Sequence, residues 1–186
     1  MEVSMKTRSM IRTAIAVAGI LAFQYLATAE DADQWLKDAT KWSFSNGQEI
    51  NGGAKGSFTV EDVDGKKAGK LEFDFTGGGG YVTASIPFES AGNFTSLKFS
   101  VKAEAKTALL IRLKDNSNET FQYKLQYTTP GKWQEITIDP KAAKEKFGGD
   151  KNGTFDPPSK KLAIGVSKGK EAGKGVLYFS SIQVVK

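Results

Sequence analysis

Residues 71–84, LEFDFTGGGGYVTA, carry the pattern that most limits what this chain can fold into. Leu71, Phe73 and Phe75 alternate with polar residues, which is the two-residue period of a half-buried β-strand. Four glycines, Gly77–Gly80, follow, and a second strand-like segment begins directly after them. Glycine has no Cβ and adopts positive φ readily. The pattern therefore predicts a hairpin with a bare bend, which is either a plain bulged turn or a loop at the rim of a binding surface.

The first 29 residues have a different pattern. Three basic residues precede an apolar run from Ala14 to Leu26, which ends in Ala27-Thr28-Ala29. This is typical of a secretory signal peptide with an Ala-x-Ala cleavage site, and the run is shorter than the ~20 residues of a membrane-spanning helix. We therefore expect residues 1–29 to be a signal peptide and residues 30–186 to be one domain. That domain is expected to be secreted or periplasmic and not inserted in a membrane.

Nearly all of the remaining chain reads as β-strand. Alternating segments separated by Gly, Asn, Asp or Pro clusters predict an all-β antiparallel sandwich of about nine strands. Turns at 115–118 and 129–132 are hairpin-like, and single helical turns are expected at 32–39 and 141–146 within otherwise irregular stretches. The nine predicted strands are 56–63, 69–76, 81–86, 95–103, 107–114, 120–127, 133–138, 162–167 and 175–185.

The composition excludes several classes of function. The chain has no histidine and no cysteine, so the commonest general base, thiolate chemistry and soft-metal sites are absent. Residues 30–186 carry 23 basic and 20 acidic residues (26 minus 3 and 21 minus 1), a net charge of +3. The lysines are spread along strands and turns, which does not suggest nucleic-acid binding.

Carboxylate pairs are the remaining route to catalysis. Glu72 with Asp74, or Glu119 with Glu135, are conceivable partners for glycoside hydrolysis. Nothing in their spacing marks one of them as an acid with a raised pKa. We therefore predict that the protein is not an enzyme.

A polar sheet face is the best candidate for binding. The segments 95–103, 107–114 and 120–127, taken as adjacent strands, place Lys98, Ser100 and Lys102, Leu110, Arg112 and Lys114, and Gln122, Lys124 and Gln126 on the side away from the core. Arginine, glutamine and lysine side chains suit sugar hydroxyls or acidic groups, although a plain solvated face has the same pattern. The face lacks an obvious aromatic ring for stacking on a sugar; rings at the rim would come from Trp42, Tyr81, Trp133 or Phe155.

A structural calcium ion is a further candidate, held by carboxylates and backbone carbonyls. Glu49, Asp62 and Asp64 are the candidate ligands. The segment Asp62-x-Asp64-Gly65 is equally typical of a solvated turn, and no other cofactor is expected.

Seven motifs together resemble a bacterial carbohydrate-binding-like β-sandwich with the galactose-binding jelly-roll fold. They cover nearly all of residues 30–186 in order: WSF with NGQE (42–49), GAKG (53–56), FDFTGGGGYVTA (73–84), the Phe121-Gln122 strand, PGKWQ (130–134), FGGDKNGTFDPP (147–158) and KKLAIGV (160–166). Domains of this kind are often found beside glycoside hydrolase domains.

The resemblance implies a non-catalytic module that binds a polysaccharide or oligosaccharide, alone or beside an exported enzyme. Carried over by position, Arg112, Gln122, Lys124 and Gln126 line the binding face, with Tyr81 and Trp133 near it. Two departures are visible: Ser180-Ser181 replaces an Asp-Asp pair that helps to hold calcium, and Lys146-Phe147 replaces a His-Trp pair. The alternative is a structural module that packs on another exported protein, as this fold does in domains similar to complex I intermediate-associated assembly factors.

Overall fold

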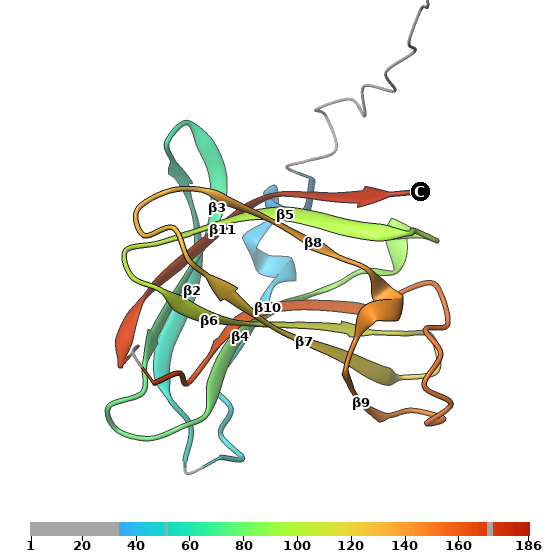
Figure 1. The fold of residues 1–186 in the computed structure, drawn as a ribbon. Helices are drawn as coiled ribbons and strands as arrows, with labels where there is room; N and C mark the ends of the chain where they lie inside the picture. Colours follow the sequence, from blue (N-terminus) through green and yellow to red (C-terminus); the bar gives the residue numbers. More distant parts are fainter. Residues whose placement is uncertain (1–33, 51, 171–172) are drawn as a thin grey trace, which may run out of the picture.

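The computed structural model describes residues 34–50, 52–170 and 173–186, and these form two antiparallel β-sheets packed face to face (Figure 1). In Figure 1, β5 and β8 of one sheet lie above β6, β7 and β10 of the other. Sheet A contains, in spatial order, β1 (Ser43–Ser45), β4 (Tyr81–Pro87), β10 (Lys161–Ser167), β6 (Thr107–Lys114), β7 (Glu119–Tyr127) and β9 (Glu145–Gly148). Sheet B contains β2 (Lys55–Val63), β3 (Lys66–Asp74), β11 (Lys174–Val185), β5 (Ser96–Ala103) and β8 (Gln134–Ile138).

The predicted antiparallel β-sandwich is confirmed, with eleven strands in the described residues rather than about nine. All nine predicted segments are strands, and the two that were missed, β1 and β9, have three and four residues. Within residues 34–50, 52–170 and 173–186 the helical segments are all short 3-10 turns, and none of them could span a lipid bilayer. The turns are η2 (Gln34–Leu36), η3 (Ala39–Lys41), η4 (Glu89–Ala91) and η5 (Pro140–Ala142).

The two expected helical turns are only partly present. Residues 34–41 form η2 and η3, and residues 32–33 lie outside the described residues. Of segment 141–146, only Lys141 and Ala142 belong to η5, because Glu145 already pairs with Gln122 as the first residue of β9.

The core lies between the sheets and follows the predicted alternation. The inward positions of β5, β6 and β7 are buried, except that Leu125 is only partly buried. Trp42 packs against Phe58 and Phe179, with ring centroids 5.3 and 5.2 Å away. Its indole Nε1 donates a 2.7 Å hydrogen bond to the Trp35 carbonyl, which ties the N-terminal turns to the core. Burial of these large side chains is the main stabilising contribution.

The prediction of a hairpin at Gly77–Gly80 is wrong. β3 pairs with β2 and β11 in sheet B, whereas β4 pairs with β1 and β10 in sheet A. The glycines therefore carry the chain from one sheet to the other. Gly79 has a φ of +79°, and a Cβ there would lie 2.2 Å from the Ala54 amide nitrogen. Gly79 lacks a side chain because the crossover passes there directly against the backbone of residues 53–54.

The two other predicted junctions differ in outcome. The hairpin at 115–118 is confirmed, since β6 pairs with β7 and the Asp115 amide donates to the Glu119 carbonyl. The turn at 129–132 exists, with the Lys132 amide donating to Thr129 at 3.0 Å. It joins β7 of sheet A to β8 of sheet B, so it is a crossover and not a hairpin. Turn residues predict a reversal of the chain but not which strands pair.

The glycine crossover yields a stability prediction. We expect Gly79→Ala to lower the free energy of unfolding by about 2 kcal/mol or more, because its Cβ meets fixed backbone at a positive φ. Gly77→Ala is the matched control, since nothing lies within 4 Å of its added Cβ, and its effect should stay within about 0.5 kcal/mol. Urea unfolding measures both. Equal stability of the two variants would contradict the account of the crossover.

Candidate functional site

The outer face of sheet A brings together four of the six predicted ligand-binding residues, namely Arg112, Gln122, Lys124 and Tyr81. β6 and β7 pair so that Arg112 lies opposite Gln122, and Lys124 lies two residues further along β7 on the same face. β10, on the other side of β6, places Ala163 opposite Arg112. β9 adds Glu145 opposite Gln122.

A chain of hydrogen bonds fixes the polar side chains of this face. Arg112 Nε donates to Gln122 Oε1 at 2.7 Å, and Gln122 Nε2 donates to Glu145. Lys124 Nζ approaches the other oxygen of Glu145 to 2.6 Å. Gln122 is only 7% exposed. Both ends of its amide are used within the protein, so it positions Arg112 rather than facing a ligand.

Two aromatic rings flank Arg112. Its guanidinium carbon lies 4.4 Å from the centroid of the Tyr81 ring and 5.8 Å from that of Phe147, both within cation–π range. Tyr81 is on β4, two strands away from Arg112. The middle of the intervening strand carries only the small residues Ala163 and Gly165 on this face, between Lys161 and Ser167 at its ends, so the arginine side chain can cross it.

These residues surround a shallow hollow of about 230 Å³, here called the Arg112 hollow. Its floor consists of small side chains from β4, β7 and β10, and its walls are aromatic and basic. Phe147 is 47% exposed at its edge. The lining residues are Ser45, Tyr81, Thr83, Ser85, Arg112, Lys114, Thr120, Phe147, Lys161 and Ala163.

Two carboxylate side chains at the edge of this site have lowered pKa values. The Tyr81 hydroxyl donates to Glu49, and this hydrogen bond is the main reason that the pKa of Glu49 lies below its ordinary value. The pKa of Glu145 is lowered chiefly by Lys124 and also by Gln122. Both carboxylates are therefore ionised at neutral pH and serve as acceptors at the rim.

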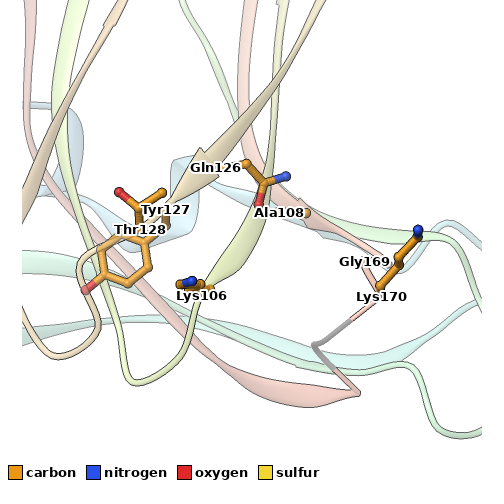
Figure 2. Close-up of a pocket in the computed structure, with 7 residues that line it drawn as sticks. All are labelled: Lys106, Ala108, Gln126, Tyr127, Thr128, Gly169 and Lys170. Atoms are coloured by element: carbon orange, nitrogen blue, oxygen red, sulfur yellow. The ribbon is translucent and has the colours of Figure 1, made fainter.

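Gln126 and Trp133 do not join the Arg112 hollow. Gln126 lines a separate hollow of about 480 Å³ (Figure 2), together with Lys106, Ala108, Tyr127, Thr128, Gly169 and Lys170. Figure 2 shows the Tyr127 ring on the other side of β7 from the Gln126 side chain. Trp133 directly precedes β8 of sheet B, where its Nε1 donates to Asp64 at 2.9 Å.

The expected face of three adjacent strands is wrong in one strand. β5 belongs to sheet B, so Lys98, Ser100 and Lys102 lie on the other sheet from Arg112 and Gln122. Leu110, expected among the exposed positions, is 2% exposed. Of the other aromatic candidates, Trp42 is buried in the core, and Phe155 is partly buried and packs against the core.

The acidic candidates serve structural contacts. Glu72 accepts from Ser57 and Asp74 from Thr76, and these bonds are the main causes that lower their pKa values. The Glu119 carboxylate, on β7 of sheet A, accepts from the Gly153 amide, whereas Glu135, on β8 of sheet B, forms an ion pair with Lys98. The members of the second pair therefore lie on different sheets, and Glu72 and Asp74 have lowered pKa values.

The proposed calcium ligands are not brought together. Glu49 binds Tyr81 beside sheet A, while Asp62 and Asp64 lie at the β2–β3 turn, where they pair with Lys67 and Lys102. Across residues 34–50, 52–170 and 173–186, no group of three acidic side chains is arranged to hold a metal ion. Ser180, at the expected Asp-Asp position, is buried and donates to the Lys67 carbonyl.

Sequence reasoning missed Phe147 and the small floor. All four residues of β9 are exposed, so no alternation indicates a strand there. Phe147 occupies the position of the tryptophan in the His-Trp pair that the resemblance leads one to expect. This correspondence could have identified Phe147 as a candidate ring at the site. Ala163 and Gly165 interrupt the apolar pattern of β10 at alternate positions, which could have indicated a space on the outer face.

Comparison with known proteins places the chain in a family. The model of the family "Complex I intermediate-associated protein 30 (CIA30)" matches residues 30–166. The chain belongs to the CIA30 family. No curated protein matches it in sequence.

Solved structures similar to this CIA30-family chain are carbohydrate-binding modules and a domain of a glycoside hydrolase. A family 11 carbohydrate-binding module of Clostridium thermocellum, in complex with a β-1,3-1,4-mixed-linked tetrasaccharide, has a TM-score of 0.59 at 14% identity, over 80% of this chain and 91% of that one. A family 28 module specific for non-crystalline cellulose has a TM-score of 0.53 at 12% identity, over 81% and 91%. An exo-β-agarase has a TM-score of 0.54 at 14% identity, over 83% of this chain and 25% of the agarase chain. These likenesses establish the fold.

The contact between Tyr81 and Glu49 can be tested by titration. We expect Tyr81→Phe to raise the pKa of Glu49 towards its ordinary value, because the hydroxyl that stabilises the charged carboxylate is lost. The stability from this bond is present above the ordinary glutamate pKa and is lost as the pH falls. NMR titration of the Glu49 side chain measures the shift. Tyr178→Phe, on sheet B, should leave it unchanged. An unaltered Glu49 pKa in Tyr81→Phe would count against the contact.

Proposed function

We propose that this protein binds a glycan without catalysis, on the outer face of sheet A. The observation that carries the proposal is the Arg112 hollow, in which a fixed guanidinium lies between two aromatic rings above a floor of small residues. Sugar rings present an apolar face and a rim of hydroxyls, so a binding site needs both an exposed ring and directed donors.

Each wall of the hollow has a separate role in this proposal. Phe147, the most exposed of the aromatic side chains at the site, packs on the apolar face of a sugar unit. Arg112 donates from its terminal nitrogens to hydroxyl or ring oxygens, because Gln122 already holds its Nε. The small side chains of Ala163 and Ser85 leave room for the sugar. The arginine is oriented before a ligand arrives, which lowers the entropic cost of binding.

Three further observations support the proposal. The fold is that of carbohydrate-binding modules, one of which holds a tetrasaccharide. Glu72 and Asp74, which were considered for hydrolysis, are held in hydrogen bonds that lower their pKa values, whereas a general acid needs a raised one. The signal-like residues 1–29 fit an exported protein that meets polysaccharide, alone or beside an exported enzyme.

Truncation of the exposed ring tests the proposal. In a screen of plant and algal polysaccharides followed by calorimetry, we expect Phe147→Ala to weaken binding roughly tenfold, the effect of losing about 1.4 kcal/mol of stacking contact. Trp133→Ala is the aromatic control on the other sheet, and its affinity should stay within about twofold of the unaltered protein.

Two results would contradict the proposal. One is no binding to any polysaccharide of the screen by the folded protein. The other is an equal loss of affinity in Phe147→Ala and Trp133→Ala, because the site would then not lie at the Arg112 hollow.

The second candidate is a structural module that packs on another exported protein. Membership of a family named for association with an assembly intermediate favours it, as do the exposed Phe44 and Ile50 near the β1 edge of sheet A. Affinity capture from the native periplasm or medium separates the two. A stoichiometric protein partner in the absence of glycan affinity would favour the structural module.

A further inference from the structure

The Arg112 hollow has an excess of positive charge. Its lining contains three basic residues, Arg112, Lys114 and Lys161, and no acidic one. The two carboxylates at its rim are already engaged, Glu145 by Lys124 and Gln122, and Glu49 by Tyr81. A neutral sugar would need donors here but no concentration of positive charge.

Two of these cations face each other. Lys161 of β10 and Lys114 of β6 are directly opposite in the antiparallel register. Such cross-strand neighbours have Cβ atoms about 5 Å apart, and like charges in this position destabilise a sheet. Within the part of the chain that the structure describes, neither lysine forms an ion pair. An anion bound between them would relieve this repulsion.

Arg112 adds a directed donor beside the two lysines. It precedes Lys114 by two residues on β6, so both side chains are on the same face. Among the described residues its recorded hydrogen bond is a single one, from Nε to the neutral amide of Gln122. Its two terminal nitrogens therefore keep their donors, in the fork geometry that suits a planar carboxylate or a sulfate.

We propose that the glycan is anionic, and that Arg112, Lys114 and Lys161 together bind a carboxylate or sulfate group carried by a sugar beside the one stacked on Phe147. This inference rests on the proposed function and specifies its ligand. The shared chemistry is an oxyanion on a sugar ring. Uronic acids and sulfated sugars are its two sources.

Matched ligand pairs that differ only in charge test the proposal. Polygalacturonate is compared with its methyl ester, and κ-carrageenan with the same polymer after desulfation, by calorimetry or gel retardation. We expect at least one charged member to bind about tenfold or more tightly than its neutral counterpart, and the pair that shows this identifies carboxylate or sulfate. Raising the salt from about 50 to 300 mM should weaken that binding roughly fivefold.

The lysines are tested by charge removal. Lys114→Gln and Lys161→Gln should each weaken binding of the charged glycan roughly fivefold, and weaken any binding of the neutral member by a clearly smaller factor. Lys98→Gln, on sheet B, is the matched control and should have no effect. All three positions are at least partly exposed, so the variants should fold.

Failure of this inference is distinct from failure of the proposed function. Equal binding of charged and neutral glycans, still weakened by Phe147→Ala, would overturn the anionic ligand alone. No binding of any glycan would overturn both. Competition by poly-L-glutamate as effective as that by the charged glycan would also overturn the inference, since the site would then recognise charge without the sugar.

Discussion

The geometry of the candidate site depends on the placement of one guanidinium group. Gln122 holds Nε of Arg112, and the side chain then crosses β10 to reach the Tyr81 ring on β4. It can do so because Gly165 and Ala163 leave the middle of the outer face of β10 almost bare. A Cβ at Gly165 would lie 2.2 Å from the Val82 carbonyl oxygen. A larger side chain on this strand would displace the arginine and fill the floor. The hollow is thus a consequence of strand order, because only the sequence β4, β10, β6, β7 places these residues side by side.

The alternation of residues in the sequence was sufficient to predict the fold class and the core. Leu97, Phe99 and Val101 are buried as expected, because a period of two residues directly reports which side chains share a face. The same period contains no information about which strands are neighbours. For this reason the pattern around Gly77–Gly80 predicts a hairpin, although the run joins the two sheets. Chain order likewise predicts β5 beside β6, although the two belong to different sheets.

The candidate site was predictable to the same extent. Arg112, Gln122 and Lys124 were identified because parity and pairing within a true hairpin suffice to bring them together. Tyr81 lies beside them because the crossover places it at the start of β4, next to Gly47 and Glu49. Trp133 follows a turn that leads from sheet A to sheet B, so the sequence could not show that it lies away from this site. Phe147 lies on a fully exposed edge strand, where neither hydrophobic pattern nor burial distinguishes a strand from a loop.

Family membership and fold leave a choice between glycan binding and protein assembly, and the location of a bound ligand decides it most directly. The measurement is an NMR titration of the backbone amides with hexagalacturonate and, in parallel, with a κ-carrageenan hexasaccharide. The account predicts that the shifted resonances lie at the Arg112 hollow, with Ala163, Gly165 and Ser85 among the largest changes, while the outer positions of sheet B, such as Thr59 and Val176, remain unchanged. Shifts centred on sheet B, or no shifts with either ligand at millimolar concentration, would contradict it.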